Sequence, residues 1–286
     1  MSTKRKARQS ANSFEVYPPR KEEDTPKLHE AILRLTELDP KFISVTFGAG
    51  GSSTRDSLSV LKFIRDNSTA SPLAHLTCVG TTEADAKELV GVFLGEGISD
   101  FLALRGDLPE GQTRMPPGTL SRADQLVKLI GEARADRQGI TAVAAFPNGH
   151  PESGKDRSDI AALLAKQEAG ASFAITQLFF FAEDYLNFVS LARSRGVTMD
   201  LIPGIMPIVS PNRLSRVLEL TGERKPEELA QRLGQAEDAA SRREVGINCA
   251  ASLVSELADA GIDAVHLYAF NEYANVTEAL RRAGVV

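Results

Sequence analysis

Short apolar runs alternate with amphipathic segments along nearly the whole chain. The runs have the length and the apolar or β-branched content of buried strands. The segments between them carry apolar residues three and four positions apart, as at Leu28, Ile32 and Leu35, which is typical of helices that bury one face. The predicted strands are 13–17, 42–47, 73–79, 101–105, 141–146, 173–179, 200–205 and 264–269.

Glycines mark several joints where a predicted helix ends and the next strand begins. A glycine just past the last helical turn adopts the left-handed conformation that closes the helix. We expect this role for Gly97, Gly139, Gly170, Gly196 and Gly261. Eight strands joined by helices in this regular way predict an α/β fold, a (β/α)8 TIM barrel. An open doubly wound sheet is the alternative, although no G-x-G-x-x-G motif follows an early strand.

The regular alternation is interrupted between predicted strands seven and eight. The sequence there contains more helix than one barrel unit requires, with helices starting at Pro211, at residues 225–228 and at Ala239. We therefore expect extra helices between these two strands. A final helix over 276–282 would close the chain.

Composition and charge narrow the class of protein. The net charge of -5 over 286 residues argues against a nucleic-acid-binding surface. No stretch approaches the ~18 apolar residues of a membrane span, and Cys78 and Cys249 both lie in apolar runs, as expected for reduced thiols in a cytoplasmic protein. Residues 1–12 are polar and basic, which predicts a disordered arm before a single catalytic domain over 13–286. The sequence leaves the oligomeric state open.

Polar residues gather at or just beyond the carboxyl ends of the predicted strands. In a parallel barrel these ends share one face, and that face carries the active site. The strand 101–105 runs directly into Gly106-Asp107. The cation of Arg105 and the carboxylate of Asp107 would therefore lie at one point, where the glycine between them lets a ligand approach the backbone closely. The other residues of this rim are Glu15, Thr46, His75, Thr77, Phe146, Asn148, His150, Gln177, Phe179, Tyr268, Asn271 and Glu272.

Each rim residue also has a purely structural interpretation. A histidine within an apolar strand, such as His75, is more often a satisfied core residue than a ligand. Arg105-Gly106-Asp107 could form a surface turn, and Phe179-Phe180-Phe181 could be plain core. It is the collection of polar groups from many strands at one rim that favours an active site.

Two kinds of chemistry can be considered for this rim, a metal site and acid–base catalysis. The ligand spacing typical of metal sites is missing, which does not favour a metal held by the side chains of Glu15, His75, Asp107 and His150. Two carboxylates near one pocket could instead divide the labour. One would be kept protonated by apolar neighbours and act as an acid, and the other, beside Arg105, would stay ionised.

Six motifs in a fixed order carry a resemblance to a known family. They are Ser13-Phe14-Glu15 before Pro18-Pro19-Arg20, Ser44-Val45-Thr46-Phe47-Gly48-Ala49, His75-Leu76-Thr77-Cys78, Ala103-Leu104-Arg105-Gly106-Asp107, Ile175-Thr176-Gln177-Leu178-Phe179-Phe180 and Ile202-Pro203-Gly204-Ile205-Met206-Pro207. Together they resemble the 5,10-methylenetetrahydrofolate reductase family. The resemblance covers nearly the whole chain from Ser13. The chain resembles the bacterial catalytic domain alone, with no regulatory domain attached.

The resemblance implies a (β/α)8 barrel that carries FAD and uses NADH or NADPH. NAD(P)H would reduce the flavin, and the reduced flavin would convert methylenetetrahydrofolate to 5-methyltetrahydrofolate in one-carbon metabolism and methionine supply. It implies Glu15 as the acid and Asp107 as the carboxylate beside flavin and pterin. The substrate residues it implies are Thr46, Asp107, Gln177, Phe179 and Arg213. The cofactor residues it implies are Thr46, Phe47, His75, Arg105, Gly106, Asp107, Ala123, Phe146, His150, Asp159 and Lys166.

The chain departs from the family pattern at several of these positions. Phe146 stands where relatives usually have tyrosine, and Ala162 and Ala165 stand where they often carry polar or basic residues. Glu272 replaces an arginine that grips the folate tail, and Val217 falls where some relatives have an aromatic residue. These departures predict weaker flavin retention, and the alternative to the flavin route is direct hydride transfer from the nicotinamide. Two other functions stay open for the whole chain. One is a folate-binding barrel that transfers a methyl group, and the other is a non-catalytic folate or nucleotide binder.

Overall fold

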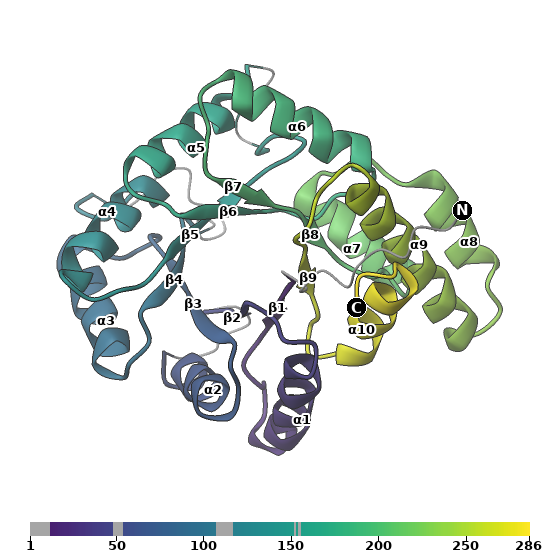
Figure 1. The fold of residues 1–286 in the computed structure, drawn as a ribbon, viewed down its shortest axis with the longest axis horizontal. Coiled ribbons are helices and arrows are strands. Elements are labelled where there is room, and N and C mark those ends of the chain that lie inside the picture. Colours follow the sequence, from purple (N-terminus) through teal and green to yellow (C-terminus); the bar gives the residue numbers. More distant parts are fainter. Residues whose placement is uncertain (1–11, 48–53, 107–116, 152, 154–155) are drawn as a thin grey trace.

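In the computed structural model the described residues are 12–47, 54–106, 117–151, 153 and 156–286, and their strands form one parallel sheet. The sheet order is β7-β6-β5-β4-β3-β2-β1-β9-β8, which curls into the ring of Figure 1. The strands are β1 Ser13–Val16, β2 Phe42–Val45, β3 Ser71–Thr77, β4 Asp100–Leu104, β5 Thr141–Ala145, β6 Phe173–Thr176, β7 Asp200–Ile202, β8 Gly204–Ile205 and β9 His266–Tyr268. This arrangement confirms the predicted (β/α)8 barrel.

The helices lie outside the ring of strands, as Figure 1 shows. They are α1 Thr25–Thr36, α2 Thr54–Asn67, α3 Glu83–Gly95, α4 Ala123–Arg134, α5 Ser158–Glu168, α6 Ala182–Ser194, α7 Pro211–Thr221, α8 Glu227–Gln235, α9 Ala239–Asp259 and α10 Tyr273–Arg282, with a short 3-10 helix over Glu22–Asp24. Three of them, α7 to α9, lie between β8 and β9 and confirm the predicted insertion. The last helix begins at Tyr273, three residues before the predicted start.

The strand predicted over 200–205 is divided in two at Pro203. Its first part, β7, pairs with β6, and its second part, β8, pairs with β9. Proline has no N–H to contribute to a ladder, whereas its carbonyl still accepts a hydrogen bond from His266 N at 2.9 Å. The divided strand thus turns the sheet from one neighbour to the other and brings the two ends of the ring together.

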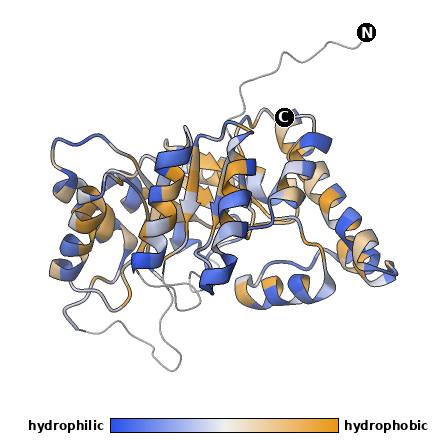
Figure 2. Ribbon diagram, turned by 90° about the horizontal axis from the view of Figure 1, so that it is seen from below, coloured by the Kyte–Doolittle hydropathy of each residue, from blue (hydrophilic) through white to orange (hydrophobic). Residues whose placement is uncertain are grey.

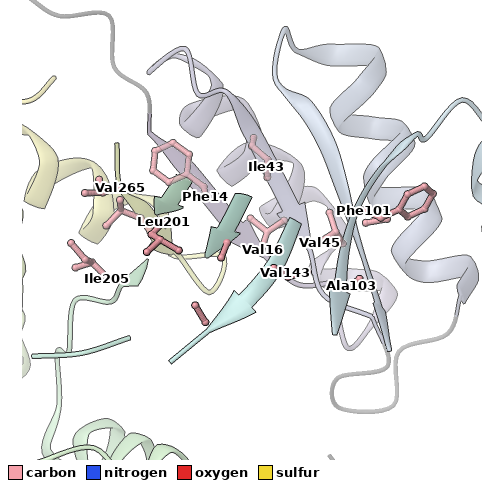
Figure 3. Close-up of a cluster of buried hydrophobic side chains, with 14 of the residues drawn as sticks. Phe14, Val16, Ile43, Val45, Phe101, Ala103, Val143, Leu201, Ile205 and Val265 are labelled. Carbon is pink, nitrogen blue, oxygen red and sulfur yellow. The ribbon is translucent and has the colours of Figure 1, made fainter. Parts of the chain in front are cut away.

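The two faces of the sheet bury separate groups of side chains. Successive residues of a strand point to opposite faces. In β1, Phe14 and Val16 belong to the large cluster that packs under the helices, part of which Figure 3 shows. Ser13 and Glu15 therefore face the lumen, where Phe42, Leu73, Leu102, Ala142 and Ile175 form a second cluster. In Figure 2 the strands at the centre are largely hydrophobic, and the helices around them carry hydrophilic residues.

Four of the five predicted joint glycines adopt the left-handed conformation, and the prediction for Gly139 is wrong. The values of φ are +77° at Gly97, +106° at Gly170, +94° at Gly196 and +90° at Gly261. Helix α4 already ends at Arg134, so Gly139 lies too far along the chain to close it. A Cβ at Gly139 would instead meet the Ser99 carbonyl and the Arg134 side chain, so this position requires glycine for close approach.

Some predictions fall on residues outside the described ranges, namely most of the 1–12 arm, Gly48 and Ala49 of the second motif, and Asp107. Asn12, predicted as the last residue of the arm, is buried, and its carbonyl accepts a hydrogen bond from Lys41 N at 2.9 Å. Among the described residues, no helix combines the length and the apolar character that crossing a membrane requires.

Candidate active site

Glu15 lies in the lumen between two histidines. Its Oε2 is 3.6 Å from His75 Nε2 and 3.9 Å from His266 Nε2. The three residues come from β1, β3 and β9, and the Glu15 side chain is 15% exposed. The barrel therefore presents one partly open carboxyl group between two buried imidazole rings.

Strand pairing explains why these residues meet. Glu15 pairs with Tyr268 and Ser13 pairs with His266 in the β1–β9 ladder, so all four side chains face the lumen. The Ser13 hydroxyl contacts His266 Nδ1 at 2.9 Å, and the Tyr268 hydroxyl donates a hydrogen bond to the Thr176 carbonyl at 2.7 Å. Tyr268 thereby links β9 to β6 across the short strand β8.

The electrostatics of this cluster follow from its burial. Burial lowers the pKa of His75; Glu15 opposes this shift, and His266 adds to it. Burial also raises the pKa of Tyr268 well above its ordinary value, and the neighbouring Glu15 raises it further. His75 and Tyr268 are therefore both uncharged near neutral pH.

Four buried polar atoms around Glu15 have no hydrogen-bond partner among the residues that the structure describes. They are Ser44 Oγ, Thr46 Oγ1, His75 Nε2 and His266 Nε2. A buried polar atom that forms no hydrogen bond is costly, and such atoms are therefore rare in folded proteins. Ser44, Thr46 and His75 lie on β2, just beyond its end and on the neighbouring strand β3, and their unpaired atoms are what a pocket for a polar ligand requires.

A second polar group surrounds Lys166 on α5. Lys166 Nζ donates a hydrogen bond to the Ala144 carbonyl of β5 at 2.9 Å. Burial lowers the pKa of Lys166 to about 8, Asp124 and Asp159 act in the opposite direction, and Arg105 lowers it further. Arg105 and Lys166 thus bring two cationic groups close enough to influence each other, which suits a bound anion.

Arg157, which no sequence pattern indicated, joins this group. Its guanidinium holds both oxygens of Asp159 at 3.0 Å and donates to the Phe146 carbonyl at 3.0 Å. Arg157 adopts a left-handed conformation with φ of 55° just before α5. No local sequence signal indicated this pair, because side chains two positions apart do not ordinarily face each other on a helix.

The other predicted cofactor residues are aromatic or small. The rings of Phe146 and His150 pack edge to face with centroids 4.7 Å apart. Gly106 has φ of +82°, and a Cβ there would press on Val79 and Thr77. Ala123 is the buried first residue of α4, and Phe47 packs partly buried against the main core.

The predicted substrate residues are less closely grouped. The Gln177 side-chain oxygen accepts a hydrogen bond from Leu178 N at 2.9 Å. Phe179 is 2% exposed and stacks on Tyr185, and it lines a cavity of 560 Å³ with residues of α8 and α9. Arg213 on α7 forms an ion pair with Glu272 at 3.4 Å and lies over the Phe270 ring at 5.8 Å.

The structure thus brings the sequence-predicted residues into two groups. Glu15 meets His75, while Arg105, Asp159 and Lys166 interact around β4 and β5. Phe179 and Arg213 contact other parts of the chain, and Asp107 lies outside the described residues. The structure adds His266, which the sequence could have indicated in the same way as His75, since both are single histidines within apolar strands.

A parallel barrel with an acid between imidazoles, and with a cationic group beside it, has the organisation of an enzyme that acts on small polar molecules. Comparisons with known proteins agree with this class. The family model described as "Methylenetetrahydrofolate reductase" matches residues 1–284. The chain belongs to the methylenetetrahydrofolate reductase family.

Individual relatives show how far the similarity extends. The chain is 36% identical over 260 residues to the 5,10-methylenetetrahydrofolate reductase of Escherichia coli (strain K12), which covers 91% of this chain and 86% of the relative. It is 32% identical to the methylenetetrahydrofolate reductase (NADH) 1 of Zea mays, where 97% of this chain matches 49% of the plant protein. A protein from Clostridium thermocellum, described as binding two copies of 5-methyl-5,6,7,8-tetrahydrofolic acid, shares the fold with a TM-score of 0.63, 14% identity and coverage of 96% of this chain and 94% of its own.

Proposed function

We propose that this protein reduces 5,10-methylenetetrahydrofolate to 5-methyltetrahydrofolate with NADH or NADPH, through bound FAD. In this role it would serve one-carbon metabolism and methionine supply. The observation that carries the proposal is Glu15, a carboxyl group held in the lumen between His75 and His266 in a member of the reductase family. An acid at that place is needed for the first step of the reaction, and a passive folate carrier has no need of one.

Glu15 would act by protonating the folate amine nitrogen that leaves the methylene carbon. The carbon–nitrogen bond of the five-membered ring then breaks, and the one-carbon unit becomes an iminium carbon. That carbon accepts a hydride, whose two electrons come originally from NAD(P)H. Proton donation by a positioned side chain typically contributes about 10²–10⁴-fold to a rate.

The residues of the second group fit a dinucleotide. Arg105 and Lys166 suit the pyrophosphate, and a bound anion would favour the charged form of Lys166 that burial opposes. Ala123 begins α4, and a helix N-terminus presents backbone N–H groups to phosphate. Bound there, FAD would carry two electrons between NAD(P)H and the folate.

Other predicted residues would line the flavin ring and the folate. We assign Phe47 and Phe146 to the walls of the ring site, with His75, His150 and the close approach at Gly106. Thr46, Gln177 and Asp107 would contact the pterin, and Asp159 would act through its pair with Arg157. Phe179 and Arg213 would act at the far end of the folate.

Direct hydride transfer from the nicotinamide, without flavin, is the second candidate. Phe146 favours it, because an apolar ring packed on His150 takes a place where relatives usually offer a tyrosine hydroxyl. Ala162, exposed on α5, likewise offers no polar contact to a dinucleotide. The acid role of Glu15 is the same in both candidates.

The decisive assay measures folate-dependent oxidation of NADH and of NADPH under anaerobic conditions, with chromatographic detection of 5-methyltetrahydrofolate. We expect one product molecule for each nicotinamide oxidised. A folate-binding methyltransferase-like barrel would show folate binding without nicotinamide oxidation. Absence of product with either nicotinamide, both with and without added FAD, would contradict the proposed function.

A further inference from the structure

His266 is held in one orientation by contacts on three sides. It is fully buried, and its Nδ1 contacts the Ser13 hydroxyl at 2.9 Å. Its ring stacks on Phe42 with centroids 5.7 Å apart and meets the ring of Tyr268 edge to face at 5.2 Å. The ring therefore cannot turn without breaking a hydrogen bond and two aromatic contacts.

This orientation points the second ring nitrogen at Glu15. His266 Nε2 lies 3.9 Å from Glu15 Oε2, and it has no hydrogen-bond partner within the described part of the chain. The distance is just beyond hydrogen-bond length, and such contacts in ligand-free active sites often shorten when the substrate binds. Because His266 is fully buried, Glu15 rather than a ligand is the group that its Nε2 can reach.

The Ser13 hydroxyl allows His266 to serve either form of Glu15. When the hydroxyl donates to Nδ1, the uncharged ring carries its proton on Nε2 and donates to an ionised Glu15. When Nδ1 carries the proton and donates to the hydroxyl oxygen, Nε2 accepts from a protonated Glu15. An acid must be held in both forms, because it carries the proton before the transfer and is ionised afterwards.

We propose that His266, fixed by Ser13, is a positioning residue that holds Glu15 through both of its protonation states. The proposal rests on the acid role of Glu15 in the proposed function. Among the described residues, the charged and titratable groups that face Glu15 are His75 on β3 and His266 and Tyr268 on β9. His75 lies nearer the ligand site in our assignment, which leaves His266 as the partner of Glu15 from within the protein.

Kinetics with matched substitutions test this role. We expect His266→Phe to lower kcat for folate reduction about 10-fold or more, a part of the contribution of acid catalysis, with the KM for the nicotinamide unchanged. His266→Gln should retain more activity than His266→Phe, because a carboxamide can also both donate and accept. His29→Gln is the control, since His29 stacks on Phe63 on the outer helices. Equal kcat values for the Phe, Gln and wild-type proteins would overturn the proposal.

A spectroscopic measurement tests the contact without relying on turnover. The chain has four histidines, so the ¹⁵N signals of labelled imidazoles can be assigned by single substitutions. We expect the Nδ1 and Nε2 shifts of His266 to change between the wild type and Glu15→Ala at one pH, because the substitution removes the carboxyl group that faces Nε2. Identical His266 shifts in the two proteins would overturn the proposal.

Two further comparisons distinguish failure of the positioning role from a folding defect and from failure of the proposed function. If His266→Phe does not fold, Ser13→Ala replaces it, because loss of the Nδ1 partner should also lower kcat while removing only a hydroxyl. If the wild-type protein forms no 5-methyltetrahydrofolate, the proposed function fails, and the imidazole spectra still decide whether His266 follows Glu15. Normal kcat in Ser13→Ala together with normal kcat in His266→Phe would contradict the positioning role alone.

Discussion

Glu15 is the residue on which the proposed chemistry depends. Replacing it with glutamine keeps the size and polarity of the side chain and removes the proton that it would donate. We expect Glu15→Gln to lower folate reduction roughly 10²-fold or more, because that is the usual contribution of a positioned acid. The assay is folate-dependent NAD(P)H oxidation, with the thermal unfolding curve as a check on the fold. Turnover at the wild-type rate would show that another group supplies the proton.

Lys166 would make the proposed anion binding at the second group dependent on pH. Its pKa is lowered by burial to about 8, below the ordinary lysine value of about 10.4. In the folded protein it therefore carries its charge below about pH 8 and loses it as pH rises through that value. We expect the dissociation constant for the dinucleotide to rise above pH 8, by up to about tenfold per unit while Lys166 titrates.

The measurement is a binding titration between pH 7 and pH 9.5, with Lys166→Met as the comparison. The variant should bind more weakly at pH 7 and lose most of the dependence on pH. A wild-type affinity that stays constant over this range would show that the charge of Lys166 does not contribute to binding of the anion. Arg105 provides the internal reference, because a guanidinium keeps its charge throughout the range.

Residues that depend on local position were predictable, and contacts that depend on ring closure were not. Glu15, His75 and Arg105 follow from their places near the ends of apolar runs. His266 meets Ser13 because the first and last strands of the barrel pair, and no local pattern shows which nitrogen will face Glu15. Arg157 was not predicted. Its left-handed backbone turns it toward Asp159, and the neighbouring sequence does not indicate that conformation.

At the scale of elements, hydrophobic periodicity predicted the strands and helices. It did not predict that one strand is divided in two. The three inserted helices begin where proline or a change of composition predicted them. The division of one apolar run into β7 and β8 was missed, because the apolar residues continue on both sides of Pro203, although a proline rarely lies inside a paired strand. Which of two neighbours each half pairs with is a property of the closed sheet.

The short strand β8 offers a sharp test of how the barrel closes. A Cβ at Gly204 would meet the Thr176 carbonyl and the Tyr268 ring, which are themselves joined by a hydrogen bond. We expect Gly204→Ala to destabilise the fold by about 2–4 kcal/mol, from overpacking and the weakened hydrogen bond. Urea unfolding measures the change.

Gly234 in α8 is the matched control for this substitution. A Cβ there would meet nothing within 4 Å, so Gly234→Ala should be neutral or stabilise by up to about 1 kcal/mol. Equal stabilities for the two alanine variants would show that the contact between β8 and Tyr268 has room to relax. Loss of folate reduction in Gly204→Ala, with stability kept, would instead indicate that Tyr268 had moved within the site.

At the scale of the whole molecule, closure of the ring makes one site from residues distant in the sequence. Ser13 and Glu15 come from the first strand, His75 from the third and His266 from the last. The second group, around Lys166, lies on the neighbouring β4 and β5 side of the same barrel. The candidate acid and the cationic group that we propose for the anion are thus placed on one scaffold, and binding of a cofactor between them is the property to test.

We expect this protein to hold FAD more weakly than its relatives do. Phe146 packs on His150 and offers no hydroxyl, and Ala162 and Ala165 offer no polar group on α5. A hydrogen bond to a charged group is worth ~1.5–3 kcal/mol, and ~1.4 kcal/mol corresponds to tenfold in affinity. Loss of one or two such bonds would weaken binding by about 10- to 1,000-fold or more.

The visible spectrum of freshly purified protein, followed by titration and assay with FAD, measures this retention. We expect pale or colourless protein whose folate-dependent turnover rises with added FAD, and Phe146→Tyr should shift the titration to lower FAD concentrations because it restores a hydroxyl beside the ring site. Protein that stays fully yellow through dialysis would contradict weak retention. Colourless protein whose turnover is indifferent to FAD would contradict the flavin route, and the acid role of Glu15 would then serve direct transfer from the nicotinamide.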